Sequence, residues 1–168
     1  MSGPAVERRD VETHGVDSRV VIVTGAGQGI GRGVALHLGK HGASIVVAEW
    51  KQHRAERTVA ELTDLGVPAL AVVCDIMHRE QIDAMVAQTL DHFGKVDALV
   101  NNAQTFRPQA PLATVSEEFR AALAGSIPFP SRLATAEEFA ALVVSIVEHD
   151  YLNGETVRFD GALRMASR

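Results

Sequence analysis

Cysteine is nearly absent from this sequence, with Cys74 the only one among 168 residues. A single cysteine excludes an internal disulfide framework and is typical of a reducing compartment. No apolar run reaches membrane-spanning length, and no charged segment followed by an apolar one resembles a secretion signal. The formal net charge of −5 gives no electrostatic reason to bind nucleic acid or an anionic membrane. We therefore expect a cytoplasmic protein with neither nucleic acid nor membrane as a partner.

The composition indicates one globular domain. Hydrophobic residues make up 46% of the chain and charged residues 22%, which suits a domain large enough to bury a core. Residues 1–18 are polar and lack any hydrophobic period, so we predict a mobile N-terminal arm followed by a single domain over residues 19–168.

The stretch VVIVTGAGQGIG, from Val20 to Gly31, is the most informative part of the sequence. Its apolar start predicts a buried parallel strand, and the glycines that follow lead into apolar residues at helical spacing. A strand, a glycine turn and a helix together predict a phosphate-binding site. Small residues let the backbone approach a pyrophosphate, and unpaired amides at the helix start attract its charge.

Three further apolar runs predict buried strands at Ser44–Ala48, Ala69–Cys74 and Val96–Val100. Helical patterns lie between them, over Gln52–Leu65 and Gln81–Phe93. Strands that alternate with helices predict an α/β fold, a Rossmann-like doubly wound parallel sheet with its ligand at the carboxyl ends of the strands.

Polar residues follow those strands at Glu49, Asp75 and Asn102. Glu49 lies where a dinucleotide fold places its ribose-binding carboxylate, which accepts hydrogen bonds from ribose hydroxyls and repels a 2′-phosphate. This favours NAD over NADP. Glu49 as the cap of a surface loop is the alternative, and Lys51 and Arg54 offer charges that suit a phosphate. Trp50 is predicted to lie against the adenine or to be a partly buried loop aromatic.

Residues 105–168 form an irregular C-terminal part. Thr114 with Glu117 and Thr135 with Glu138 are capping boxes that predict two helices. The segment Glu155–Phe159 predicts a last strand. We expect this strand either to pair beside Val96–Val100 or to pack loosely or on a second subunit, which leaves a sheet edge exposed.

The motifs resemble those of the short-chain dehydrogenase/reductase family. TGAGQGIG at residues 24–31 is similar to its TGxxxGIG cofactor signature, Cys74-Asp75-Ile76 to its adenine-binding strand end, and Asn101-Asn102-Ala103-Gln104 to its NNAG segment, with Gln104 in place of glycine. The C-terminal words PFPSRL and YLNGETVRFDGALRM most resemble the branch that contains type 2 3-hydroxyacyl-CoA dehydrogenase.

The resemblance implies an NAD-dependent oxidoreductase that acts on a hydroxy or oxo group of a 3-hydroxyacyl-CoA-like or steroid-like small molecule, as a possible homo-oligomer. It also implies which residues contact NAD(H). These are Gly25, Gln28, Gly29, Ile30 and Gly31 at the pyrophosphate, Glu49 at the adenosine ribose, Asp75 and Ile76 at the adenine, and Asn102 and Ala103 beside the nicotinamide ribose.

The family's proton-transfer residues have no counterpart. Such enzymes use a Tyr, a Lys four residues later and a Ser, whereas here the only tyrosine, Tyr151, is followed at that spacing by Glu155. We predict no catalytic residue and interpret the gap as one missing block whose joint falls between Ser116 and Ser126. The alternatives to a slow dehydrogenase are a non-catalytic NAD-binding module and a truncated fragment.

His37 and His41 have metal-site spacing but no third ligand nearby, so we predict no metal site.

Overall fold

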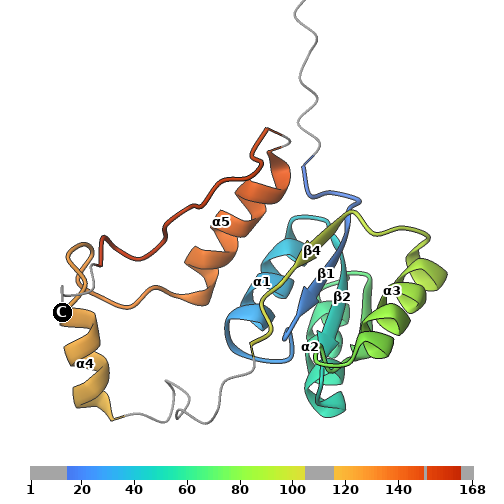
Figure 1. The fold of residues 1–168 in the computed structure, drawn as a ribbon, viewed down its shortest axis with the longest axis horizontal. Helices are drawn as coiled ribbons and strands as arrows, with labels where there is room; N and C mark the ends of the chain where they lie inside the picture. Colours follow the sequence, from blue (N-terminus) through green and yellow to red (C-terminus); the bar gives the residue numbers. More distant parts are fainter. Residues whose placement is uncertain (1–14, 105–115, 150, 164–168) are drawn as a thin grey trace, which may run out of the picture.

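Four parallel strands form the centre of the protein (Figure 1). The computed structural model describes residues 15–104, 116–149 and 151–163. Strands β1 (Val20–Thr24), β2 (Ser44–Glu49), β3 (Ala69–Val73) and β4 (Ala98–Val100) lie in the order β3-β2-β1-β4. In register, Val21 of β1 aligns with Ile45 of β2 on one side and with Ala98 of β4 on the other. The predicted α/β fold with a doubly wound parallel sheet is confirmed.

Helices cover both faces of the sheet. The described helices are α1 (Gly29–Lys40), α2 (Gln52–Asp64), α3 (Arg79–Phe93), α4 (Glu117–Gly125) and α5 (Ala136–Glu148), of which α4 lies away from the sheet (Figure 1). Helices α1 and α2 pack on one face, with α5 against α1, and α3 packs on the other (Figure 1). None of the described helices has the length and apolar character needed to cross a membrane.

Strand β1 separates two hydrophobic cores. Its side chains alternate, so that Val21 and Val23 pack in the core beneath α1, α2 and α5, while Val20 and Ile22 pack in the core beneath α3. Both faces of this strand are buried, which is why its sequence is a continuous apolar run.

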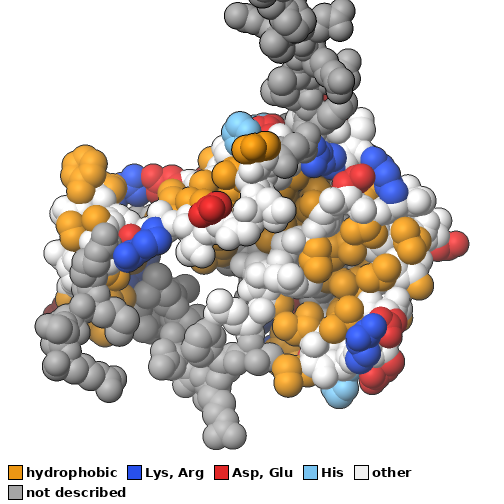
Figure 2. All heavy atoms as spheres, turned by 45° about the horizontal axis from the view of Figure 1, so that its top comes forward, with side chains coloured by type: hydrophobic (Ala, Val, Ile, Leu, Met, Phe, Trp, Pro, Cys, Tyr) orange, Lys and Arg blue, Asp and Glu red, His pale blue; other side chains and the backbone are white. Residues whose placement is uncertain are grey.

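The side of the molecule that carries α3 shows gathered hydrophobic side chains (Figure 2). Val86 and Leu90 of α3 and Leu99 of β4 are each more than a third exposed. Strand β4 is the last strand of the described sheet, so Leu99 has strand β1 on one side only.

Residues 15–18 belong to the domain and not to the predicted arm. Val16 is 1% exposed within the core beneath α1, and the Ser18 N–H donates to the Gly42 carbonyl at 3.1 Å. Burial of an apolar side chain and a backbone bond to the turn after α1 hold this segment in place. Residues 1–14 of the predicted arm lie outside the described residues.

The prediction of a last strand is wrong. Glu155–Phe159 contains no strand, and the described sheet ends at β4. Helix α5 packs so closely on α1 that a Cβ on Gly33 would lie 2.6 Å from the Ala136 Cβ. The chain then runs back along the outer side of α5 (Figure 1), where the rings of Phe139 and Phe159 lie 6.1 Å apart. A strand needs a hydrogen-bonded neighbour, and this path keeps the segment away from β4.

One of the two predicted capping boxes is confirmed. Thr135 and Glu138 exchange both side chain to backbone bonds at the start of α5. The hydrogen bonds and charge of Arg132, together with the Thr135 N–H, lower the pKa of Glu138 to about 2. Helix α4 begins differently from the prediction, because Ser116 is its N-cap and accepts from the Phe119 N–H at 3.3 Å. Thr114 lies outside the described residues.

Two fully buried threonines give a matched test of the core. The Thr58 hydroxyl on α2 has no hydrogen-bond partner among the described residues, whereas the Thr89 hydroxyl on α3 donates to the Met85 carbonyl at 2.8 Å. Thr58→Val removes an unsatisfied polar group at constant volume and should raise the free energy of unfolding by about 1–2 kcal/mol. Thr89→Val removes a satisfied one and should give no gain. Urea unfolding followed by circular dichroism measures both, and equal changes would contradict this description of the core.

Candidate functional site

A groove runs across the carboxyl ends of the strands. It consists of two adjoining cavities of about 370 and 510 Å³, which share part of their lining. The shared residues are Gly25, Gln28, Trp50, Ala103 and Gln104. Every residue predicted to contact the cofactor lines one or both cavities: Gly25, Gln28, Gly29, Ile30, Gly31, Glu49, Asp75, Ile76, Asn102 and Ala103. Four strand ends that are far apart in the sequence thus contribute to one groove.

The glycine turn has a buried half and an exposed half. Ala26 and Gly27 are buried, whereas Gln28, Gly29 and Ile30 are exposed toward the groove. The Gly25 N–H donates to the Ala48 carbonyl at 2.7 Å, which joins the turn to the end of β2. The buried half anchors the turn, and the exposed half is free to contact a ligand.

Glycine is required where helix α1 approaches the end of β1. A Cβ on Gly31 would lie 2.4 Å from the Gly25 carbonyl oxygen and 2.4 Å from Asn102 Nδ2. Neither neighbour has room to move, because one is backbone and the other is hydrogen-bonded. Any larger residue at position 31 would push α1 away from the sheet.

The start of α1 meets the physical requirements of a pyrophosphate site. Gly29 has a φ of +56°, and a Cβ placed on it would meet nothing within 4 Å among residues 15–104, 116–149 and 151–163. The N-cap residue Gln28 makes no side-chain bond to the helix. Backbone N–H groups at this helix start therefore face an open cavity, and the helix dipole adds a partial positive charge.

Glu49 lies at the end of β2 as predicted, but its carboxylate is already engaged. The residue is 3% exposed, its Oε2 accepts from the Gly27 N–H at 3.2 Å and its Oε1 accepts from the Lys51 N–H at 3.3 Å. Each oxygen retains a second lone pair, so the carboxylate still has acceptor capacity toward the groove. The alternative of a surface-loop cap fits less well, because Glu49 is buried and bonds the glycine turn.

Asn102 fastens the end of β4 to the end of β1. Its N–H and that of Ala103 both donate to Thr24 Oγ1 at 3.0 Å, and its Nδ2 donates to the Thr24 carbonyl at 2.9 Å. Thr24 Oγ1 in turn donates to the Val100 carbonyl at 3.3 Å. This set of bonds fixes the backbone of residues 102–103 at one wall of the groove.

Asp75 and Ile76 form the other end of the groove, together with Trp50, which the sequence analysis considered, and Met77, which it did not. The Asp75 N–H donates to Gln81 Oε1 at 2.8 Å, and Asp75 Oδ1 accepts from the Met77 N–H at 3.0 Å, which holds the turn after β3. Met77 and Trp50 both line this cavity and are both largely exposed. An Asp side chain commonly accepts from the backbone N–H two residues later, so Asp75 in the sequence could have indicated a turn that contains Met77.

Cys74 also lines this end of the groove but is not poised as a nucleophile. Burial, with a contribution from the Asp75 charge, raises the pKa of the Cys74 thiol. A raised pKa keeps the sulfur protonated at neutral pH and unreactive.

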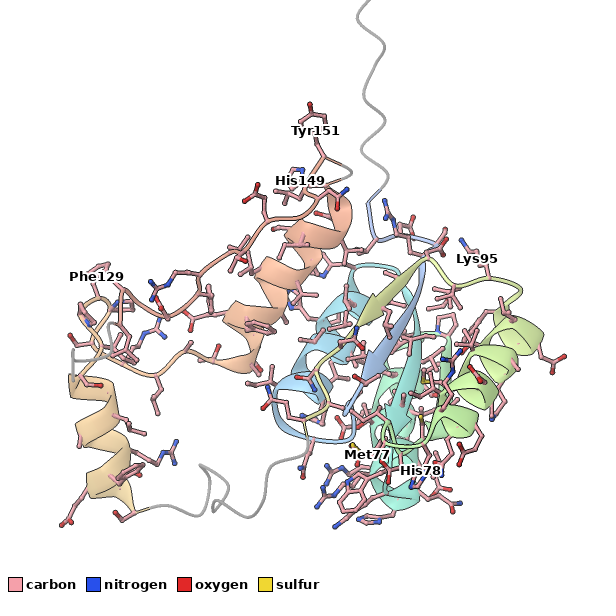
Figure 3. The ribbon with its side chains drawn as sticks, in the orientation of Figure 1. Met77, His78, Lys95, Phe129, His149 and Tyr151 are labelled. Atoms are coloured by element: carbon pink, nitrogen blue, oxygen red, sulfur yellow. The ribbon has the colours of Figure 1, made fainter. Side chains whose placement is uncertain are left out.

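Tyr151 is far from the groove. It projects into solvent beyond the C-terminal end of α5, at the opposite end of the molecule from Met77 and His78 (Figure 3). Glu155 is likewise exposed. The structure therefore gives Tyr151 no contact with the groove.

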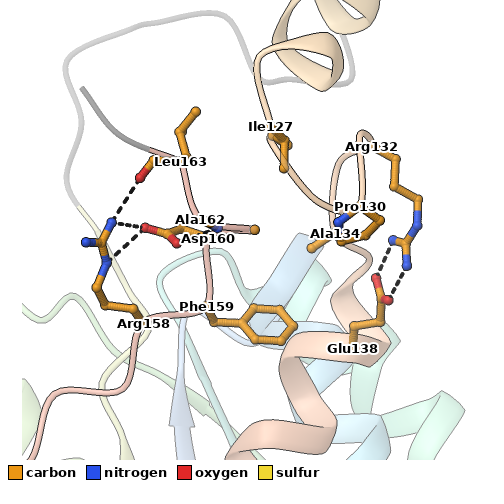
Figure 4. A pocket seen from close by; sticks show the side chains of 11 residues that line it. Ile127, Pro130, Arg132, Ala134, Glu138, Arg158, Phe159, Asp160, Ala162 and Leu163 are labelled. Carbon is orange, nitrogen blue, oxygen red and sulfur yellow. Dashed lines mark hydrogen bonds and ion pairs between the residues drawn. The ribbon is translucent and has the colours of Figure 1, made fainter. Parts of the chain in front are cut away.

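A third cavity of about 430 Å³ lies among the C-terminal segments and contains none of the predicted residues (Figure 4). Ile127, Pro130 and Phe159 line it, and its two arginines are neutralised by Glu138 and Asp160. Sequence reasoning missed this cavity, because its lining comes from irregular segments that no motif brings together.

Comparisons with known proteins agree with this geometry. Residues 19–127 match the family model described as short chain dehydrogenase. A dehydrogenase subunit of Thauera aromatica, BbsD, which acts on a hydroxy(phenyl)methylsuccinyl-CoA, is 38% identical over 53% of this chain and 36% of its own length. The 7alpha-hydroxysteroid dehydrogenase of Escherichia coli is 37% identical over 64% of this chain and 42% of its own.

Solved structures of dehydrogenases are also similar to this chain. A 7alpha-hydroxysteroid dehydrogenase in complex with NADH and 7-oxo glycochenodeoxycholic acid superposes with a TM-score of 0.54 and 32% identity, over 79% of this chain and 47% of that one. The chain thus spans less than half the length of these relatives. The matched family model covers most of the chain, including both ends of the groove. The chain belongs to the short-chain dehydrogenase family.

Proposed function

We propose that the groove binds NAD(H), and that the chain is the cofactor-holding part of an oxidoreductase that acts on a hydroxy or oxo group of a small molecule. The observation that carries this proposal is the convergence of four strand ends and the open start of α1 on one groove. When bound, the nicotinamide ring of this cofactor accepts or donates a hydride.

Each part of the groove has a role in this proposal. The exposed half of the glycine turn, Gln28–Ile30, faces the pyrophosphate, and Gly25 and Gly31 let the start of α1 lie close to the ends of β1 and β4. Glu49 accepts from the adenosine ribose. Asp75 and Ile76 contact the adenine, with Trp50 and Met77 offering apolar surface beside it. Asn102 and Ala103 flank the ribose on the nicotinamide side.

The preference for NAD rests on Glu49. Its carboxylate is tied at both oxygens to backbone N–H groups, so it has little freedom to move away from a 2′-phosphate. A like charge held at that position repels the phosphate of NADP. Arg54 lines the same groove, and its positive charge attracts a 2′-phosphate and so opposes the effect of Glu49.

The proposed substrates are 3-hydroxyacyl-CoA-like or steroid-like molecules. Two relatives support this class, since one is a hydroxysteroid dehydrogenase and another acts on a CoA thioester. Homo-oligomerisation, like the substrate, is proposed on family resemblance.

Carbonyl chemistry also needs a proton donor at the reacting oxygen, and neither Tyr151 nor the lysines of this sequence provide a Tyr-x-x-x-Lys pair. NADH binding without turnover, the behaviour of a cofactor-binding module, is therefore the second candidate.

Gly29→Ala tests the pyrophosphate site. Gly29 and Gly94 both have left-handed φ values, +56° and +77°, and in the described part of the chain a Cβ on either would meet nothing within 4 Å. Alanine should therefore cost each variant a similar stability of about 1 kcal/mol. Only Gly29 lines the groove, so only Gly29→Ala should raise the dissociation constant for NADH, by about tenfold. Fluorescence titration with NADH measures this, and equal affinities for the two variants would argue against the site.

Glu49→Gln tests cofactor preference. The amide oxygen can still accept from the Gly27 N–H, so the turn keeps its anchor, while the charge and the acceptor for the Lys51 N–H are lost. We expect the preference for NADH over NADPH to fall by about fivefold or more, from paired titrations with the two cofactors. Glu56→Gln, on the exposed side of α2, is the control and should leave the ratio unchanged. An unaltered ratio in Glu49→Gln would remove Glu49 from the ribose assignment.

Turnover by the chain alone should be slow. A missing general acid/base lowers rates by about 100- to 10,000-fold, so the purified chain of verified mass should oxidise a 3-hydroxyacyl-CoA or a 7α-hydroxysteroid at 1% or less of the rate of a full-length relative. The assay is NADH absorbance, run beside the E. coli hydroxysteroid dehydrogenase. Turnover comparable with that enzyme would show that another group transfers the proton.

A further inference from the structure

Gly27 is held on both sides of its backbone, although it is not one of the three glycines of the cofactor signature. Its N–H donates to Glu49 Oε2 at 3.2 Å, and its carbonyl accepts from Arg57 Nη2 on helix α2 at 3.0 Å. A Cβ on Gly27 would lie 2.6 Å from both Glu49 Cγ and Arg54 Cβ. The turn therefore lies against β2 and α2 as closely as glycine alone permits.

Arg57 is itself held by a second layer of charges. Glu61, one turn further along α2, lies 3.9 Å from Arg57 Nε through its Oε1. The same carboxylate pairs with Arg32 in the first turn of α1, where Arg32 Nε donates to Oε1 at 3.2 Å and Nη2 bonds the other oxygen. Glu61 therefore bridges α2 and α1 and restrains the guanidinium that reaches Gly27.

The orientation of the Gly27 carbonyl determines where the next amide points. In a planar trans peptide the C=O and the following N–H point in opposite directions. Arg57 draws the Gly27 carbonyl toward α2, so the N–H of Gln28 is directed away from α2. Gln28 begins the exposed half of the turn and lines both cavities of the groove.

We infer that Arg57 is a positioning residue for the dinucleotide site: through the Gly27 carbonyl it orients the first amide of the turn that faces the pyrophosphate. The inference rests on the proposed function. Nothing in the cofactor signature indicates this role, because Arg57 comes from a helix that the motif does not include. The Arg57 side chain is more than half exposed, so it contributes by orienting the turn and not by filling the core.

Arg57→Met and Arg57→Lys separate positioning from structure. Methionine keeps the apolar stem and loses the donor, and one hydrogen bond corresponds to about a threefold to tenfold rise in the dissociation constant for NADH. Lysine retains a charged donor and should restore most of the affinity. Arg79→Met is the matched control, since Arg79 pairs with Asp83 on α3, outside the groove.

The measurements are NADH fluorescence titration and thermal unfolding of the full chain. Weaker NADH binding by Arg57→Met, rescue by lysine, an unchanged Arg79→Met and similar melting temperatures for all support the inference. NADH binding by Arg57→Met equal to that of the unmodified chain overturns it, as does failure of lysine to rescue. If the unmodified chain does not bind NADH, the proposed function itself fails, which is a different result from failure of Arg57 alone.

Discussion

The contact between helix α1 and the end of β1 is the constraint on which the rest of the structure depends. A side chain at Gly31 would meet the Gly25 carbonyl and the Asn102 amide at 2.4 Å, so three elements are joined where no side chain fits. Thr24 and Asn102 add hydrogen bonds that tie β1 to β4 at the same place. Between these two fixed points, Gly25 and Gly31, residues Gln28 to Ile30 of the turn are exposed toward the groove.

The same arrangement explains why charges surround the turn without filling it. Glu49 and Arg57 approach Gly27 from the buried side and bond its N–H and carbonyl. On the opposite side, over Gly29, no atom of the described residues lies within 4 Å of a Cβ placed there. A turn anchored from behind and open in front suits a ligand that is recognised mainly by backbone amides.

The sheet and the groove could be predicted from the sequence, because in the N-terminal half of the chain the local sequence patterns agree with the final fold. Continuous apolar runs identified the four parallel strands, and the polar residues after them converge because carboxyl ends of parallel strands share one edge. Gly27 and Arg57 could not be predicted, since their importance comes from the distance between the turn and α2. The segment 155–159 has the composition of a strand, but α5 packs on α1 and leads it elsewhere, so tertiary packing overrides the local preference. The burial of Val16 could not be predicted, because a single apolar residue in a polar segment has no hydrophobic period.

The groove and the only tyrosine of the sequence are far apart. Glu49 and Asp75 line the groove, whereas Tyr151 lies at the other end of the molecule, and the chain spans less than half the length of the relatives it matches. The most direct test of the central claim is the set of backbone amide shifts in an NMR titration of the isotope-labelled chain with NADH. The account predicts that the largest shifts fall on Gln28, Gly29 and Ile30, with Asp75 and Ala103 next. Shifts confined to the cavity around Ile127 and Phe159, or no shifts at all, would contradict it.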